Sequence, residues 1–333
     1  MVAPLRVADQ NMRLINRTEH RGYSHDPTVL ALDFSAGICD TIFIYEMGAD
    51  TVLRAAFAGY TFELIGCDDM HNADKFARFP SSDAPVDCRV EVTVQSEYLR
   101  PQGEPLMQAG DWRCYAHGDR KRIYHRYATL MIEATDDFSS SHLFFCDKMP
   151  MLETILYLQV QQMIGSFLLL HGKSLIHSAG LSLGDKGILL CGRSGVGKST
   201  MTAHLQRLEE SLTVLSEDMP AVMRENGGST LCGTPLCGDD ECCANGNAPL
   251  THIVFLRQAP HNQMRPLADA EAVYELLTVL PRAVYAPMIT AAATDWSVAL
   301  ANEIPITVFE NDGTEQAARM LLHELQNGQR VYI

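Results

Sequence analysis

The sequence has little positive charge for its length. It holds 26 lysine and arginine residues against 41 aspartate and glutamate residues, so its 333 residues carry a formal net charge of −15. Broad nucleic-acid binding and docking on anionic membranes both depend on basic residues that meet phosphate groups. We therefore expect neither a nucleic acid nor a membrane as partner, whereas a basic partner surface is compatible with this charge.

The sequence also lacks the apolar runs of exported and membrane proteins. Its first residues, MVAPLRVADQNMRLINR, contain no apolar core of a secretory signal. The most apolar window, residues 151–170, carries Glu153 and three glutamines, which a membrane span of that length rarely does. We expect this window to be a buried helix and the protein to be cytoplasmic. Its ten cysteines are then expected to be free thiols.

The chain is long enough for about two domains, and its two halves differ in pattern. We assign residues 1–148 to a β-rich α+β N-terminal domain and expect it to recognise the substrate. Its expected strands are apolar, aromatic or β-branched runs at 90–99, 122–134 and 142–147. Residues 149–333 mix strands and helices, which indicates α/β architecture.

The second half shows a regular order of elements. After the helix at 151–170, we expect strands at 174–183, 187–191, 211–218, 251–258 and 304–310, and helices at 200–210 and 315–325. The first two strands are separated only by the turn signal Gly184-Asp185-Lys186.

Residues 186–200 read KGILLCGRSGVGKST, an apolar strand that runs into glycines and then into Lys-Ser-Thr. The segment from Gly192 to Ser199 fits G-x-x-x-x-G-K-[ST], the phosphate-binding loop motif. Glycines let backbone N–H groups curve around a phosphate, and the following helix directs its free N–H groups at the same anion. The alternative is a glycine-rich structural turn, but the strand before the motif and the helix after it favour nucleotide binding.

The motif assigns roles to individual residues. Lys198 would reach the β and γ phosphates of the nucleotide, and Ser199 would bind Mg²⁺. The predicted nucleotide-binding residues are Gly192, Ser194, Gly195, Val196, Gly197, Lys198, Ser199 and Thr200.

Two acids follow the loop and its helix. Glu217 and Asp218 end the expected strand 211–218. A P-loop protein places an acid there to hold Mg²⁺, and a second acid can accept a proton from an attacking hydroxyl. The alternative is a pair of solvated carboxylates at a strand end.

One histidine precedes the loop. His177 lies in the expected strand 174–183, fifteen positions before Gly192 (192 − 177). If this strand pairs with 187–191 as a hairpin, His177 approaches the phosphate site. The alternative is a histidine satisfied within an apolar core.

Together these pieces resemble the kinase domain of the HPr kinase/phosphorylase family. The pieces are His177-Ser-Ala-Gly, the loop GRSGVGKS, and Ser216-Glu217-Asp218. Weaker similarity to stand-alone members, which are related to phosphoenolpyruvate carboxykinase, continues through GTPLCG and APLTHIVFLRQ. The resemblance covers roughly residues 165–330, about half of the chain.

The resemblance implies that residues 149–333 form a P-loop HPr-kinase/carboxykinase-like kinase domain with ATP and Mg²⁺ as cofactors. The implied reaction transfers the γ-phosphoryl group to a serine hydroxyl of a peptide or protein, such as a ribosomally made precursor peptide. Lys198 and Ser199 match the family's residues for the triphosphate and Mg²⁺. Glu217 and Asp218 match its acid pair, and His177 matches its active-site histidine.

The sequence departs from the family in ways that leave alternatives open. The usual pair is Asp-Asp, so which of Glu217 and Asp218 is the base and which the metal ligand stays open. Thr200 stands where the bacterial regulator has an acid, and the N-terminal half does not resemble that regulator, so HPr itself is not the expected substrate. Two other functions stay open: a small-molecule kinase, and a nucleotide-binding sensor or scaffold without phosphoryl transfer. Whether the protein forms a homo-oligomer is also open.

Four cysteines crowd into LCGTPLCGDDECC, at Cys232, Cys237, Cys242 and Cys243. Four thiolates can bind zinc, but the spacing lacks the C-x2-C pairs of a zinc site. Free thiols in a loop are the favoured interpretation. The acids between them, residues 239–241, favour a basic partner or a substrate-facing loop.

Overall fold

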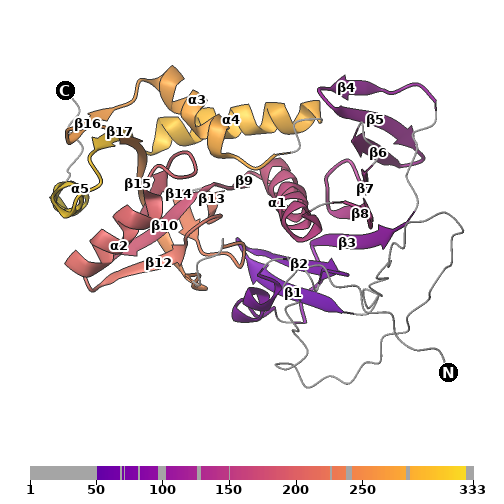
Figure 1. Ribbon diagram of the computed structural model, residues 1–333, viewed down its shortest axis with the longest axis horizontal. Helices are drawn as coiled ribbons and strands as arrows, with labels where there is room; N and C mark the ends of the chain where they lie inside the picture. The colour runs from indigo at the N-terminus through magenta and orange to yellow at the C-terminus, as the bar shows by residue number, and fades with distance from the viewer. Residues whose placement is uncertain are drawn as a thin grey trace, which may run out of the picture. The chain divides into compact units, whose positions relative to one another are not determined.

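The computed structural model describes residues 51–327, except 68–69, 71, 82, 97–102, 126–128, 150, 226, 238–241 and 283–285. The chain divides into two compact units, Met1–Glu46 and Met47–Ile333, and the first lies wholly outside the described residues. Within the second unit the described strands form two large sheets (Figure 1). The expected mixed α/β class is therefore observed, while the domain boundary at 148/149 stays a prediction. The acids at 239–241 lie outside the described residues.

The first sheet has eight strands in the order β1-β2-β3-β8-β7-β6-β5-β4. The pairs β2·β3 and β3·β8 are parallel, and the others are antiparallel. The strands are β1 Val52–Phe57, β2 Tyr60–Ile65, β3 Cys88–Gln95, β4 Met107–Ala109, β5 Trp112–His117, β6 Arg120–His125, β7 Leu130–Ala134 and β8 Ser140–Cys146, and a short 3₁₀ helix, η2, spans Ala73–Arg78.

The composition of the run at 122–134 suggested a single strand, but the structure forms two strands there. It contains the end of β6 and all of β7, which pair antiparallel with Ile123 opposite Ile132. Aromatic and β-branched residues favour extended structure but do not mark where a strand reverses. Residues 126–128 between the two strands lie outside the described part.

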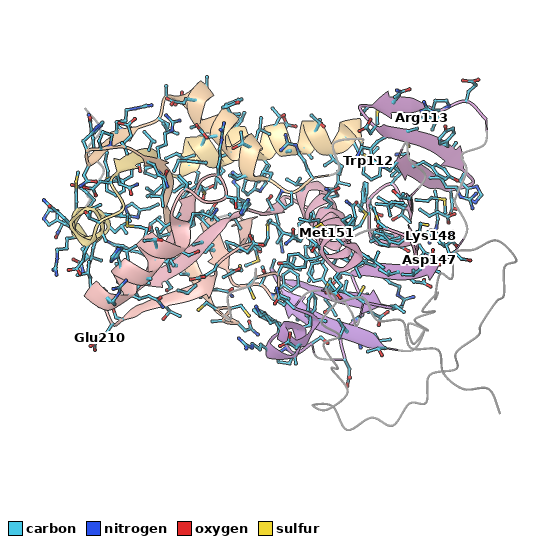
Figure 2. All side chains as sticks on the ribbon, viewed as in Figure 1. Trp112, Arg113, Asp147, Lys148, Met151 and Glu210 are labelled. Atoms are coloured by element: carbon cyan, nitrogen blue, oxygen red, sulfur yellow. The ribbon has the colours of Figure 1, made fainter. Side chains whose placement is uncertain are left out.

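The apolar window forms helix α1, Leu152–Leu170, as expected. Among the described residues, its side chains are part of the largest hydrophobic cluster, which includes residues of both sheets. Figure 2 draws the side chains on the ribbon, with Met151 labelled at the start of α1. The helix packs against β3 of the first sheet, β9 (Lys173–Leu175) of the second sheet, and helix α4 (Pro287–Glu303). Burial on several sides explains why it is apolar almost all round. Among the described helices, none combines the length and apolar character needed to cross a bilayer.

The second sheet has nine strands. Its main path is β12-β10-β11-β15-β14-β13-β9, and β17 pairs with both β15 and β16. The remaining strands are β10 Ser178–Leu183, β11 Lys186–Cys191, β12 Leu212–Ser216, β13 Ala221–Glu225, β14 Gly228–Cys232, β15 Asn247–Gln258, β16 Gln263–Pro266 and β17 Ile306–Asn311.

Helices cover both faces of the central strands. Ile188 and Leu190 of β11 belong to the cluster that includes α2 (Lys198–Leu208) and α5 (Glu315–Asn327). Leu189 and Cys191, which point the other way, belong to the cluster that includes α3 (Asp269–Val279) and α4. A strand buried on both faces reads as a continuous apolar run, as GILLC does. Helices α3 and α4 were not predicted from the sequence.

Three parallel strands position the site. Cys191 of β11 pairs with Phe255 of β15, and Phe255 pairs with Val308 of β17. The carboxyl ends of these strands therefore meet at one edge of the sheet, and the glycine-rich loop begins there. Ligands of open α/β sheets bind at this kind of edge.

Candidate functional site

The glycine-rich loop connects the end of β11 to the start of α2 and uses a backbone that other residues rarely adopt. The φ angles of Gly192, Gly195 and Gly197 are 146°, 77° and 102°. A Cβ atom on Gly192 would lie 2.8 Å from Cγ1 of Val196, so a side chain does not fit there. Helix α2 follows with no side chain capping its first turn, which leaves its N–H groups directed at the loop.

The loop is held by a few specific hydrogen bonds. Gln258, at the end of β15, donates from Nε2 to the Gly195 carbonyl at 3.2 Å. The Lys198 ammonium donates to the Gly192 carbonyl at 3.0 Å. The lysine therefore lies over the loop that precedes it rather than extending into solvent.

A pocket of about 330 Å³ brings most of the predicted residues together. Its lining consists of His177, Ser194, Gly195, Gly197, Lys198, Ser199, Thr200, Glu217 and Asp218. The other two predicted residues, Gly192 and Val196, line the neighbouring, larger pocket. One surface thus combines the glycine-rich loop, a lysine, hydroxyl groups, two carboxylates and an imidazole.

His177 reaches this pocket because of a change of strand partners. The expected strand 174–183 is interrupted: β9 pairs with β13, whereas β10 pairs with β11. His177 lies between them, one residue before Ser178, which is opposite Cys191 at the start of the loop. Its own N–H donates to the carbonyl of Val279 at 2.8 Å, outside both sheets. The expected hairpin is therefore present, and its register places His177 beside the loop.

The imidazole of His177 lies between a cation and an anion. Its Nε2 is 3.4 Å from Nζ of Lys198 and 3.4 Å from Oδ1 of Asp218. Burial and the Lys198 charge lower the pKa of His177, against the opposing effect of Asp218. Burial also lowers the pKa of Lys198. A neutral imidazole at neutral pH follows from the first shift.

The acids lie after the strand, not within it. β12 ends at Ser216, and Glu217 and Asp218 form a bend that leads into β13. Ser216 Oγ accepts from the N–H of Met219 at 3.3 Å, and Thr234 donates to the Met219 carbonyl at 2.6 Å. The strand ends two residues early because these local bonds replace ladder bonds.

Asp218 is also held from the side opposite His177. Tyr157 Oη and Gln161 Nε2, both on α1, donate to Asp218 Oδ2 at 3.4 and 3.5 Å. Burial raises the pKa of the Tyr157 phenol, so it is a proton donor throughout the physiological range. The backbone N–H of Ser178 donates to the Asp218 carbonyl at 2.9 Å. Neither α1 residue was predicted as a site residue, because they lie 61 and 57 positions from Asp218.

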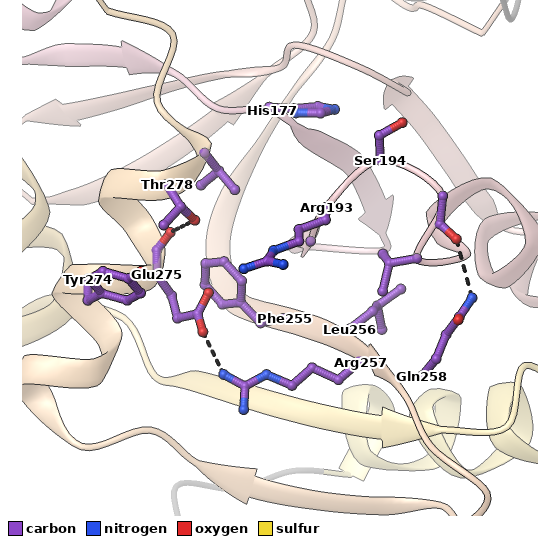
Figure 3. Close-up of a pocket in the computed structure, with 14 residues that line it drawn as sticks. His177, Arg193, Ser194, Phe255, Leu256, Arg257, Gln258, Tyr274, Glu275 and Thr278 are labelled. Atoms are coloured by element: carbon purple, nitrogen blue, oxygen red, sulfur yellow. Dashed lines mark hydrogen bonds and ion pairs between the residues drawn. The ribbon is translucent and has the colours of Figure 1, made fainter. Parts of the chain in front are cut away.

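A larger pocket of about 640 Å³ adjoins the loop (Figure 3). It lies between residues 192–196 of the loop, the end of β15 and one face of α3, and Arg193 extends into it. Arg257 pairs with Glu275 at 2.5 Å along its border. This pocket was not predicted from the sequence, because α3 was not recognised as a helix.

The oxygen ligands near Lys198 suit a magnesium ion. Ser199, Glu217 and Asp218 line the same small pocket, and a hydroxyl with one or two carboxylates is a common protein contribution to Mg²⁺ beside phosphate oxygens. No group of three or more histidine, cysteine or acidic side chains arranged to hold a metal ion occurs among the described residues.

No family model matches the chain, and no curated protein matches it. Among solved structures, it is similar to the HPr(Ser) kinase/phosphatase from Coxiella burnetii, at 12% sequence identity and a TM-score of 0.28. The match covers 46% of this chain and 99% of that one. A TM-score of this size does not establish a shared fold or function.

Proposed function

We propose that the protein is a phosphotransferase that moves the γ-phosphoryl group of ATP to a serine hydroxyl of a peptide or protein. The observation that carries the proposal is the small pocket in which the loop lysine, Lys198, faces a carboxylate, Asp218, with His177 between them. A protein that only binds nucleotide needs the loop but not a held carboxylate beside it.

The loop supports the nucleotide part of the proposal. Backbone N–H groups of a glycine-rich turn and of the first turn of α2 suit the β and γ phosphates. Lys198 adds a positive charge at the same place, and its ammonium would exchange the Gly192 carbonyl for phosphate oxygens. The larger pocket next to the loop, with Phe255 and Tyr274 in its lining, has room for the nucleoside.

Asp218 is the proposed general base. Its two oxygens are fixed by contacts from different sides, Oδ1 by His177 and Oδ2 by Tyr157 and Gln161. A carboxylate held in this way can accept the proton of an acceptor hydroxyl as that oxygen attacks the γ-phosphorus. Because His177 is neutral, its Nε2 accepts from Lys198 or donates to Asp218, depending on the tautomer, and keeps the two groups apart.

Ser199 and Glu217 are the residues proposed to hold Mg²⁺, which supplies charge neutralisation on the triphosphate when bound. This division gives Glu217 the metal role and Asp218 the base role. It rests on the contacts of Asp218 with α1, which restrict its carboxylate to one position.

The proposed acceptor, a serine of a peptide or protein, rests on the resemblance of the motifs alone. The test is an intact-mass assay with ATP, Mg²⁺ and candidate peptides encoded beside the gene. We expect a gain of one phosphoryl group with the wild-type protein and none with Lys198→Ala. Lys148→Ala, an exposed lysine of the first half, is the matched control and should behave as wild type.

The same assay separates the alternatives. Consumption of ATP with free serine or another small acceptor, but with no peptide, would establish a small-molecule kinase. ATP binding without transfer to any acceptor, including water, would contradict the phosphotransferase and leave a nucleotide sensor.

A further inference from the structure

Two cysteines of the cysteine-rich segment, Cys237 and Cys243, form a pair near the end of β12 and the helix η2. Cys237 is fully buried, and Cys243 is partly exposed. A side-chain hydrogen bond between the two thiols shifts the pKa of each, and the Cys237 thiol also lies within hydrogen-bond distance of the Pro235 carbonyl, at 3.6 Å. Of the other two, Cys232 is buried in β14 and donates to the Thr230 carbonyl, and Cys242 is exposed.

The backbone on both sides fixes this pair. Cys243 forms a β-bridge with Ser216, and the next residue, Ala244, donates from its N–H to the Leu215 carbonyl at 3.0 Å. The Cys237 carbonyl accepts from Nδ2 of Asn72 at 2.6 Å. The backbone at each of the two cysteines is therefore held by residues that are distant in the sequence.

Among the described residues, two cations of η2 lie near the pair. Nη1 of Arg78, on η2, lies 3.8 Å from the Cys243 sulfur. Lys75 of the same helix is buried, at 4% exposure, and its charge acts to lower the pKa of both thiols. Cations beside a sulfur favour its thiolate form.

The two thiols consequently differ in character. The hydrogen bond with Cys237, together with Arg78 and Lys75, lowers the pKa of Cys243 to about 6. The same hydrogen bond and burial raise the pKa of Cys237. At neutral pH this is one accessible thiolate beside one buried thiol, the arrangement of an attacking and a resolving cysteine.

We propose that Cys243 and Cys237 form an oxidisable pair, a modification site at which hydrogen peroxide drives formation of an intramolecular disulfide. In the first step the Cys243 thiolate attacks one peroxide oxygen: an S–O bond forms, the O–O bond breaks, and hydroxide leaves. In the second step Cys237 attacks the sulfur of the resulting sulfenic acid: the S–S bond forms, and the hydroxyl leaves as water with the Cys237 proton. The two sulfurs together lose two electrons, and the peroxide gains them.

The proposal is independent of the phosphotransferase assignment. It uses no residue of the loop pocket, and its chemistry needs only peroxide. The site lies close to the proposed base all the same, because Ser216, the bridge partner of Cys243, is two positions before Asp218.

The direct test is peptide mapping of the full chain after limited peroxide treatment without reductant. We expect a Cys237–Cys243 disulfide with the loss of two hydrogens, reversed by dithiothreitol. In Cys237→Ser, Cys243 should stop at the sulfenic acid and be captured by dimedone. A disulfide from Cys242 to either partner, or overoxidation of Cys243 in the wild type without a disulfide, would overturn the proposal.

A second measurement needs no change at the buried Cys237. At pH 6, we expect iodoacetamide to alkylate Cys243 about tenfold faster than a cysteine in an unstructured peptide, since its larger thiolate fraction outweighs its lower intrinsic nucleophilicity. Arg78→Gln should reduce this rate, whereas Arg207→Gln, an exposed arginine on α2, should not. Equal rates for Cys243 and the peptide would contradict the charge assignment on which the pair depends.

Discussion

The glycine-rich loop and the bend that carries Glu217 and Asp218 line the same pocket but are held in different ways. The shape of the loop comes from its own glycines, and Gln258 donates one hydrogen bond to it. Asp218 is held by residues distant in sequence: Tyr157 and Gln161 of α1. The shape of the loop is therefore set locally, whereas the position of Asp218 depends on the packing of a buried helix between two sheets.

The largest effect is expected in the local half. Lys198→Ala removes the positive charge that the account places at the β and γ phosphates, so ATP turnover should fall by at least about 100-fold. Lys148→Ala is the control. The effect is measured as ADP release with Mg²⁺ and acceptor at saturating concentrations. If Lys198→Ala kept turnover within a few-fold of wild type, the proposed role of the loop in ATP binding would be wrong.

The next effect is expected at the acid itself. Asp218→Asn preserves the shape of the side chain but cannot accept a proton, so turnover should fall by about 100- to 10,000-fold. Asp185→Asn, in the exposed β10–β11 turn, is the matched acid and should leave turnover unchanged. If Glu217→Gln rather than Asp218→Asn abolished transfer while leaving the binding of Mg²⁺ with ATP unchanged, the two roles would be exchanged.

The supports of the acid should have smaller effects that separate positioning from binding. Tyr157→Phe removes one hydrogen bond to Asp218, worth about 0.5–1.5 kcal/mol, which corresponds to a loss of about 2- to 12-fold. We expect the loss in kcat, with the KM for ATP unchanged. Tyr115→Phe, an equally buried tyrosine of the first sheet, should change neither. A change confined to KM would show that α1 does not position the base.

The smallest effect is a shift in titration. Protonating His177 would add a second positive charge beside Lys198 in a partly buried place, so its acid form is disfavoured. The pKa of His177, followed by NMR and assigned with His177→Gln, should lie below the ordinary 6.5. In Lys198→Met it should rise. A His177 that titrates above 6.5 in the wild type would mean that the Asp218 contact dominates.

Local patterns were predicted well from the sequence. The apolar run and the glycines identified β11, the loop and α2, because all three are built from consecutive residues. The His177 hairpin followed from a short turn between two apolar strands, and the structure pairs β10 with β11. The roles assigned to the site residues stay predictions.

Long-range features were not predicted. The strand at 174–183 is interrupted because the chain changes from β13 to β11 as its partner, and no local pattern records such a change. Gln161 was visible as a polar residue in an apolar helix, but its partner, Asp218, is 57 positions away. The cysteine cluster was visible in the sequence, but the contact of Cys243 with Arg78 was not, because Arg78 is 165 positions away.

The central claim is that Lys198 binds the nucleotide whereas Asp218 acts as the base. Its most direct test is the affinity for MgATP, measured by calorimetry on the wild type, Lys198→Ala and Asp218→Asn. The account predicts that the wild type and Asp218→Asn bind within about threefold of each other, because the base does not hold the nucleotide. Lys198→Ala should bind at least about tenfold more weakly, because it loses a charge-assisted contact to phosphate. No binding by the wild type, or an equal loss in both variants, would contradict it.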